Sequence, residues 1–379
     1  MKKYFILLLL FLVSPIFAQG VERVLTLDDC TKLALNINQD ILIANEAILF
    51  AEQRINEAKS LYFPKLDLNF NVSRFDNDFP TLINSHYLPA TILLPMIGDI
   101  DYFYSTKLAL WQPIYNGGKT AATNKLAKIN YEKAKTNAEI KKNEVIAQVK
   151  SQFYKNIALK EKIQIYKDYL SKKSNASLQE QLEILEHQYE LETLELLSLI
   201  GLELDTVIDI EGTLETEKLD LDLQQCILWA YQFRPEIKTT QYQESMDNIG
   251  VNLITMEKLP TVMLGASYDW LGDNLEKWEK DWYISLNINL PLFEGGALFS
   301  RLKQKKIQAR QATIERAKIE DRIKLEVRKS FSEYNFWYNK LLKIEAIKNK
   351  SLEQDILKAD IKYNYVNSLT DLLKVMGKQ

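Results

Sequence analysis

The sequence predicts a mostly α-helical protein with a transmembrane β-barrel portion, because helix breakers are scarce, the chain is duplicated, and short alternating segments interrupt its helical patterns. Its 379 residues hold 12 Gly and 9 Pro. Average usage of about 7% and 5% would give roughly 45 such residues, about twice the number present. Neither residue type occurs in 119–200 or in 297–376. Because Gly and Pro are the residues that disfavour helix interiors most, we expect long helices in both segments.

Composition excludes several classes of function. The chain is 46% hydrophobic and 26% charged with a formal net charge of -3, which suits a globular or coiled-coil protein and argues against disorder. There is no basic block that would suggest nucleic-acid binding. Two His and two Cys are too few for a His/Cys zinc site, and glycine-rich phosphate-binding motifs are absent. We therefore expect no catalytic, cofactor or metal site, and no enzyme.

The N-terminus predicts export. Lys2 and Lys3 precede an apolar run at 4–13, and the small residue Ala18 lies where a signal peptidase would cut, so residues 1–18 are predicted to be a signal peptide. A membrane anchor, the alternative, needs about 20 apolar residues. No later segment approaches a transmembrane helix, so any membrane insertion must use strands.

The chain contains two copies of one unit, predicted at 19–212 and 213–379. The motif Leu-x-Leu-x-x-Cys-x-x-x-Ala begins at Leu25 and again at Leu221. Four prolines are expected at the starts and ends of strands, and two glycine pairs at strand-to-helix turns, where unusual backbone angles are needed. These matched residues are Pro64 and Pro260, Pro113 and Pro291, Gly117-Gly118 and Gly295-Gly296.

The two cysteines, Cys30 and Cys226, occupy equivalent positions in the two copies. The sequence favours two small buried thiols. A disulfide remains the alternative, since exported proteins allow one.

Each copy is predicted to contain a helix, two strands and a long helix. Apolar residues recur at steps of 3 and 4 from 27 to 61, and the period then changes to 2. Strands are expected at about 66–72, 102–112, 262–270 and 282–290, near the length of about 9–11 residues that crosses a bilayer at a tilt. A helix over 297–366 would measure about 105 Å at about 1.5 Å per residue.

Aromatic residues gather at the strand ends and are predicted to lie at membrane–water interfaces. A soluble β-sandwich with ordinary sheet aromatics is the alternative for this feature alone. These interface aromatics are Trp111, Trp270, Trp282 and Tyr283.

The order of these motifs, duplicated, resembles the TolC family of outer-membrane efflux proteins over essentially all of the mature chain. The resemblance implies a homotrimer whose subunits each give four strands to a 12-stranded barrel in outer-membrane lipid and their helices to a periplasmic tunnel. It also implies a passive exit duct for drugs, metals or proteins, working with a periplasmic adaptor (membrane fusion protein) and an inner-membrane transporter. Polar alternates such as Asn69 and Asn287 would line a wet lumen.

The resemblance further implies an acidic periplasmic gate at the helix tips. Asp371 matches one acidic position, and Lys374 stands where a second acid would be expected. Ser368-Leu369 is matched with Ser177-Leu178 of the first copy, so the second copy is predicted to have a shortened returning helix.

Two readings from other classes compete with the channel. A periplasmic coiled-coil adaptor or structural scaffold would also have a signal peptide, long helices and a β portion. An exported enzyme would need a paired-carboxylate pocket, which the charged helical faces do not indicate. The tandem duplication and the alternating strands favour the channel.

Overall fold

A computed structural model describes residues 23–74, 102–172, 175–214, 221–272, 276, 278–347 and 351–378. The predicted signal peptide lies outside these residues. The chain divides into two compact units, which are described separately. The first unit comprises Met1–Asn45, Ala138–Pro235 and Glu320–Gln379, and the second comprises Glu46–Asn137 and Glu236–Ile319.

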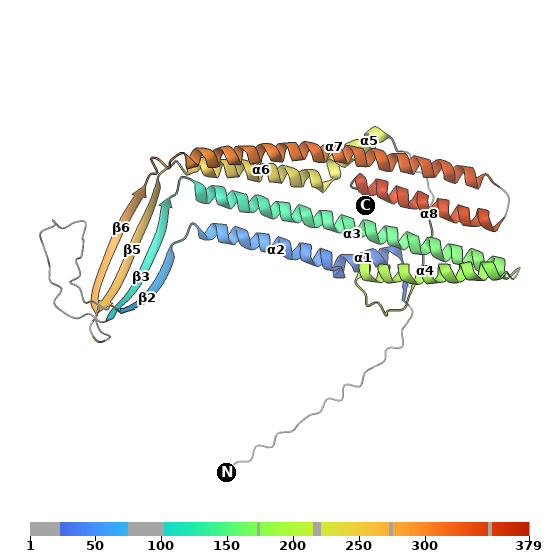
Figure 1. Ribbon diagram of the computed structural model, residues 1–379, viewed down its shortest axis with the longest axis horizontal. Coiled ribbons are helices and arrows are strands. Elements are labelled where there is room, and N and C mark those ends of the chain that lie inside the picture. Colours follow the sequence, from blue (N-terminus) through green and yellow to red (C-terminus); the bar gives the residue numbers. More distant parts are fainter. Residues whose placement is uncertain are drawn as a thin grey trace, which may run out of the picture. The chain divides into compact units, whose positions relative to one another are not determined.

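The elements of the first copy recur in the same order in the second (Figure 1). The first copy contains α1 (Leu27–Ile37), α2 (Gln39–Ser60), β2 (Lys65–Arg74), β3 (Tyr102–Tyr115), α3 (Lys119–Leu170) and α4 (Ala176–Ile200). The second contains α5 (Leu223–Phe233), α6 (Pro235–Met256), β5 (Thr261–Gly272), β6 (Glu279–Asn289), α7 (Ala297–Glu345) and α8 (Leu352–Val375). Two short strands, β1 (Arg23–Leu25) and β4 (Ile208–Ile210), pair in parallel. The predicted mostly α fold with four longer strands is confirmed.

The helical pattern over 27–61 is divided into two helices at Asn38. The Asn38 backbone leaves the helical region at φ -58° and ψ 127°, while its side-chain oxygen accepts from the backbone N–H of Asp40 at 3.0 Å and so caps the start of α2. In the second copy, Pro235 begins α6, where its missing N–H costs nothing. A proline also disfavours helical angles at the residue before it, and Arg234 is accordingly extended.

Both long helical segments are hairpins, which corrects the expectation of one unbroken helix over 297–366. Asn175 caps α4 by accepting from the N–H of Ser177, and Ser351 caps α8 by accepting from the N–H of Gln354. These polar caps end the preceding helices without any Gly or Pro. The returning helix of the second copy is therefore not shortened, because α8 has 24 residues against 25 in α4.

The core of the first unit lies where α1, α3 and α4 meet. Cys30, Val149, Leu196 and Ile200 are fully buried in one cluster. Both cysteines have free thiols and are buried, as the favoured reading predicted. Burial raises the pKa of the Cys30 thiol to about 11, so this thiol is protonated and unreactive at neutral pH.

Polar contacts also join the helices of the first unit. Asn156 is fully buried, and its amide donates to the backbone oxygens of Gln152 at 2.9 Å and Glu192 at 3.1 Å. The Tyr169 hydroxyl, near the end of α3, donates to the Asp355 carboxylate near the start of α8 at 3.0 Å. The α3–α4 turn and the α7–α8 turn therefore lie at the same end of this unit.

The second unit contains a four-stranded antiparallel sheet in the order β2-β3-β5-β6 (Figure 1). The four strands match the four predicted segments, most of which they extend by a few residues, except that β6 ends at Asn289, one residue before the predicted end. Strand β3 has a bulge between Pro113 and Tyr115. The connection between β2 and β3, which holds the extra length of the first copy, lies outside the described residues.

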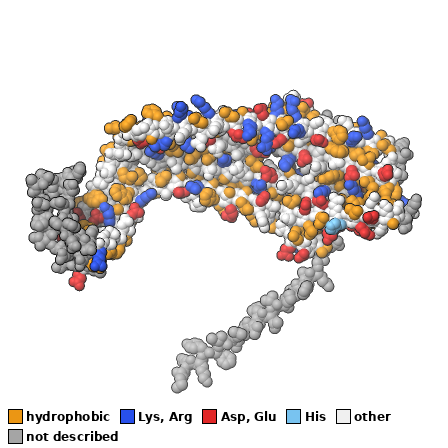
Figure 2. All heavy atoms as spheres, viewed as in Figure 1, with side chains coloured by type: hydrophobic (Ala, Val, Ile, Leu, Met, Phe, Trp, Pro, Cys, Tyr) orange, Lys and Arg blue, Asp and Glu red, His pale blue; other side chains and the backbone are white. Residues whose placement is uncertain are grey.

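Figure 2 shows Lys and Arg side chains interspersed with Asp and Glu over the helices on the face in view. Such mixed charge is typical of helix faces in contact with water. Among the described residues, no helix is long and apolar enough to cross a membrane.

Candidate functional site

The strand register assigns each residue of the sheet to one of two faces. Leu66 lies opposite Leu110, Leu110 opposite Ala266, and Ala266 opposite Ile284. Directly paired residues lie on the same face, and successive residues of a strand alternate between faces. Each face can therefore be read from four strands at once.

One face is apolar across all four strands. Its outer strands expose large side chains, with Leu68 at 68% and Ile284 at 67% exposure. We call this the apolar face, and its apolar members include Leu66, Leu68, Phe70, Val72, Tyr104, Leu108, Leu110, Leu264, Ala266, Tyr268, Trp270, Trp282, Ile284, Leu286 and Ile288. The register also places Thr106, Gln112 and Lys280 on this face. A soluble monomer rarely exposes so much contiguous apolar surface, which therefore marks a contact with lipid or another protein.

The opposite, polar face carries amides, hydroxyls and charges. Its members include Asp67, Asn69, Asn71, Ser73, Ser105, Lys107, Ser267, Asp269, Asp281, Tyr283, Ser285, Asn287 and Asn289. The predicted wet-lumen residues all fall on this face.

A charged cluster on the polar face was missed by the sequence reasoning. The Lys107 ammonium donates to the Tyr283 hydroxyl at 3.1 Å and lies 3.9 Å from the Asp269 carboxylate. Ser267 also donates to Asp269, at 3.0 Å. The sequence does show opposite charges at the polar positions of these alternating strands. It does not show which of these positions lie side by side, because that depends on the strand register.

Both outer strands have an unpaired edge in the part of the chain that the structure describes. β2 pairs only with β3, and β6 only with β5. Unpaired N–H and C=O groups on an edge can accept another strand. In lipid they must do so, because no water is present to satisfy them.

The four predicted interface aromatics divide between the two faces. Trp270 and Trp282 lie on the apolar face, where an interface role stays a prediction. Trp111 and Tyr283 lie on the polar face, which does not favour that role for them. Tyr283 contacts the Lys107 ammonium, which lies 5.0 Å from its ring centre, and the Trp111 ring covers Gly265.

The glycine pairs follow the strands and adopt left-handed angles. Gly117 and Gly118 have φ of 67° and 84°, and Gly295 and Gly296 have φ of 58° and 84°. Residues other than glycine are strained at such backbone angles, because they carry a Cβ atom. Each pair immediately precedes a long helix, α3 or α7.

Three of the four prolines flank strands. Pro64 and Pro260 each immediately precede a strand, and Pro291 follows β6. Pro113 lies inside β3, two residues before its end, next to the bulge. A proline lacks the N–H that a sheet ladder uses, which explains its place beside an irregularity.

The predicted gate residues do not lie at the α7–α8 turn. Asp371 and Lys374 lie near the C-terminal end of α8, and Asp371 is 19 residues beyond Leu352, or about 28 Å along a helix. Asp371 is therefore far from that turn, and its role in a gate stays a prediction. Burial raises the pKa of its carboxyl, and Lys374 opposes that shift.

The misplacement has a local cause. Matching Ser368 with Ser177 uses an offset of 191, whereas the caps Asn175 and Ser351 differ by 176. The second copy was thus aligned 15 residues too far along the chain.

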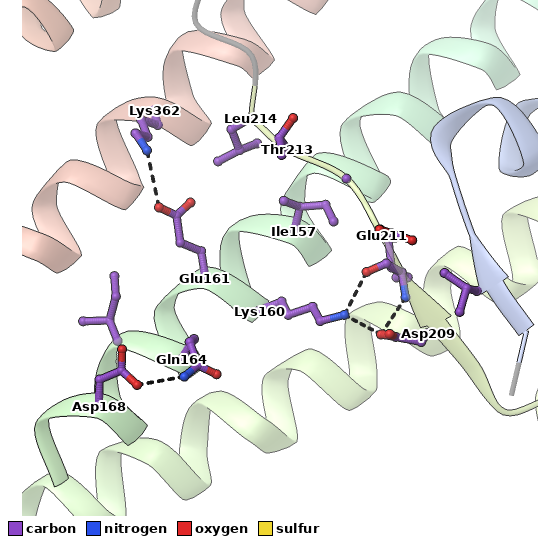
Figure 3. A pocket seen from close by; sticks show the side chains of 14 residues that line it. Ile157, Lys160, Glu161, Gln164, Asp168, Asp209, Glu211, Thr213, Leu214 and Lys362 are labelled. Carbon is purple, nitrogen blue, oxygen red and sulfur yellow. Dashed lines mark hydrogen bonds and ion pairs between the residues drawn. The ribbon is translucent and has the colours of Figure 1, made fainter. Parts of the chain in front are cut away.

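The first unit has an open cavity of about 820 Å³ beside α3, α8 and the segment after β4. Both lysines that line it are paired with carboxylates (Figure 3). The Lys160 ammonium lies 2.5 Å from Asp209, and Lys362 lies 3.5 Å from Glu161. These contacts hold neighbouring elements together and leave little charge for a ligand. The described residues contain no cluster of three or more His, Cys, Asp or Glu that could hold a metal ion.

A sheet with one apolar face, one polar face and two open edges, continued by long helical hairpins, has the fold of an outer-membrane channel. The CmeC outer membrane channel of Campylobacter jejuni is similar at 18% identity and TM-score 0.66, covering 93% of this chain and 85% of that one. The outer membrane protein VceC of Vibrio cholerae is similar at 13% identity and TM-score 0.71, covering 93% and 96%. The open state of the Neisseria gonorrhoeae MtrE outer membrane channel is similar at 13% identity and TM-score 0.72, covering 93% and 89%.

Residues 31–190 match the sequence model of the family described as "Outer membrane efflux protein". The matched segment runs from α1 into α4. This match agrees with the resemblance to TolC-type channels that the motifs predict. None of the curated proteins matches the chain.

Proposed function

We propose that this protein is a passive exit duct of the outer membrane, formed by three copies of the chain. The duct releases small molecules such as drugs or metals, or secreted proteins, which a periplasmic adaptor and an inner-membrane transporter deliver to it. Its barrel stands in the outer-membrane lipid and its helices form a tunnel in the periplasm. Transport through such a duct needs a water-filled lining and no catalytic group.

The two-faced sheet with open edges carries this proposal. An exposed apolar face is favourable in lipid, and a polar opposite face suits a water-filled lumen. The open edges of β2 and β6 require pairing with other copies.

The number of copies follows from the size of the lumen. Two copies would give a barrel of 8 strands, whose interior is filled by side chains or holds one small ligand. Three copies give 12 strands, an even number within the range of about 8–26 found in outer-membrane barrels. Three copies therefore form the smallest closed ring that is wider than such a filled barrel.

Fractionation and conductance measurements test the proposal. The full-length protein is expected in the outer-membrane fraction as a heat-modifiable trimer, and the purified trimer is expected to conduct ions in a planar bilayer. Recovery of a water-soluble periplasmic monomer without conductance would instead favour the adaptor or scaffold reading.

A further inference from the structure

A small cavity of about 270 Å³ lies in the second unit, where the polar face of the sheet meets the start of α3. Trp111 and Met263, which line it, belong to the polar face by register. The cavity therefore opens on the side that the proposed function places in the lumen, and its place on the path of solutes rests on that function. The ligand chemistry that the cavity favours does not rest on that function.

The cavity has an apolar wall. Leu61, Phe63, Trp111 and Met263 contribute to its lining. The Trp111 ring lies against Gly265, because a Cβ atom on Gly265 would stand only 2.6 Å from Trp111 Cζ3. The missing side chain thus leaves room for the indole, which forms one wall of the cavity. A half-buried aromatic side chain of this kind can pack against flat apolar groups.

Two lysines, Lys65 at the start of β2 and Lys119 at the start of α3, also line the cavity, together with Pro113, Asn116, Thr120 and Thr123. Neither ammonium has an ion pair with a described residue, and no carboxylate lines the cavity. The larger cavity of the first unit differs, because its lysines are already paired with carboxylates. The smaller cavity therefore combines an apolar wall with uncompensated positive charge.

We propose that this cavity binds small organic anions that have a flat apolar body, such as aromatic sulfonates or carboxylates. The ring would contact Trp111 and Phe63, and the acid group would lie between the ammonium groups of Lys65 and Lys119. The volume limits the ligand to about one or two rings, since ordinary ligand pockets start at about 300 Å³.

Isothermal titration calorimetry of the full-length protein in amphipol tests this site with three probes of nearly equal shape. These are naphthalenesulfonate (an anion), naphthalenesulfonamide (neutral) and naphthylmethylammonium (a cation). The anion is expected to bind most tightly, and its advantage is expected to shrink as salt is raised, because screening weakens exposed charge contacts. Equal affinity for all three probes would overturn the proposal.

Variants of the lining residues test whether the probes bind in this cavity. The double variant Lys65→Gln with Lys119→Gln is expected to bind the anion about tenfold more weakly, at about threefold per exposed lysine contact, and the neutral probe unchanged. Lys125→Gln, on an exposed part of α3 outside the cavity, is the matched control and should bind as the wild type does. Trp111→Phe should weaken both the anionic and the neutral probe.

An unchanged affinity in the double variant, or an equal loss in the control, would contradict the assignment. Blockade of the single-channel current by the anion provides a second readout. Loss of conductance in salt alone would count against the exit duct, whereas normal conductance without anion binding would count against this cavity only.

Discussion

Gly117 and Gly295 are equivalent glycines of the two copies that share a left-handed backbone but have different surroundings. At Gly117, an added Cβ would stand 2.9 Å from the Cβ of Leu259 and 3.0 Å from the backbone oxygen of Met256. At Gly295, nothing lies within 4 Å. The first glycine is thus required by both its angle and its contacts, and the second by its angle alone.

Alanine at these two positions should therefore have unequal effects on stability. Gly295→Ala is expected to cost about 1–2 kcal/mol, the strain of a left-handed residue. Gly117→Ala is expected to cost about 1–3 kcal/mol more, because the added methyl group overpacks the contact with Leu259. Thermal unfolding of both variants measures the difference. Equal losses of stability would show that the close contact between position 117 and Leu259 does not contribute to the cost of Gly117→Ala.

Glu192 connects α4 to α3 through charged hydrogen bonds. Its carboxylate accepts from the Lys155 ammonium at 2.6 Å and from the Gln152 amide at 2.7 Å. Burial acts to raise the pKa of Glu192, but these bonds outweigh it and hold the pKa below the usual value of 4.5. A lowered pKa stabilises the fold above about pH 4.5, and this stabilisation is lost as the pH falls through the folded-state value.

Glu192→Gln is accordingly expected to lower stability at pH 7 by about 1–3 kcal/mol, the range for hydrogen bonds to a charged group. The difference in melting temperature between wild type and variant should shrink as the pH is lowered from about 7 to 3. Glu190→Gln is the control, because its side chain is 74% exposed and, among the described residues, forms an ion pair with His187 alone, at 3.8 Å. A difference that stays constant with pH would contradict the assigned role of Glu192.

At the residue scale, the glycines and prolines at the ends of helices and strands could be predicted from the sequence. The face of the sheet on which a side chain lies could not, because it depends on the strand register. The glycine pairs and prolines were found because they interrupt a chain otherwise poor in both. Residue type alone predicts Trp111 and Tyr283 at the membrane interface. The alternation of side chains along β3 and β6 places both residues on the polar face. Asp371 was misplaced because the turn before α8 contains no Gly or Pro to locate it.

At the scale of elements, the two faces of the sheet predict different effects of an arginine substitution at two successive residues of β6. Leu286 of β6 is 61% exposed on the apolar face, and the next residue, Asn287, lies on the polar face. Leu286→Arg is expected to destabilise the folded barrel by about 2–4 kcal/mol if the site lies near the bilayer midplane. Asn287→Arg should fold nearly as the wild type does and alter ion selectivity instead. Urea titrations of folding into lipid vesicles compare the two, and equal destabilisation would contradict the assignment of the faces.

The strands could be predicted closely from the sequence, and the helices only in part. Alternation of apolar and polar residues located all four strands, because it is set by the pleat itself. Helix ends at Asn38, Asn175 and Ser351 depend on single capping side chains, which also occur inside helices. The helical period runs through such points without a visible change, so the sequence predicts one helix over 297–366 where the structure has the α7–α8 hairpin.

At the scale of the whole molecule, the duplicated chain gives each copy a sheet that cannot be complete alone. Strands β2 and β6 lie three strand spacings apart within one sheet, or about 14 Å at about 4.8 Å per spacing. A disulfide needs Cα atoms about 4.4–6.8 Å apart. A disulfide between β2 and β6 must therefore join different copies of the chain.

Cross-linking of these edges in outer membranes tests the trimeric duct most directly. One cysteine is placed at Asn69 of β2 and a second, in turn, at Asp281, Tyr283, Ser285 or Asn287 of β6, with Cys30 and Cys226 replaced by alanine. At the matching register, oxidation is expected to give covalent dimers and trimers on a denaturing gel and nothing larger. Monomers at every register, or a ladder that continues beyond three copies, would contradict a closed ring of three chains.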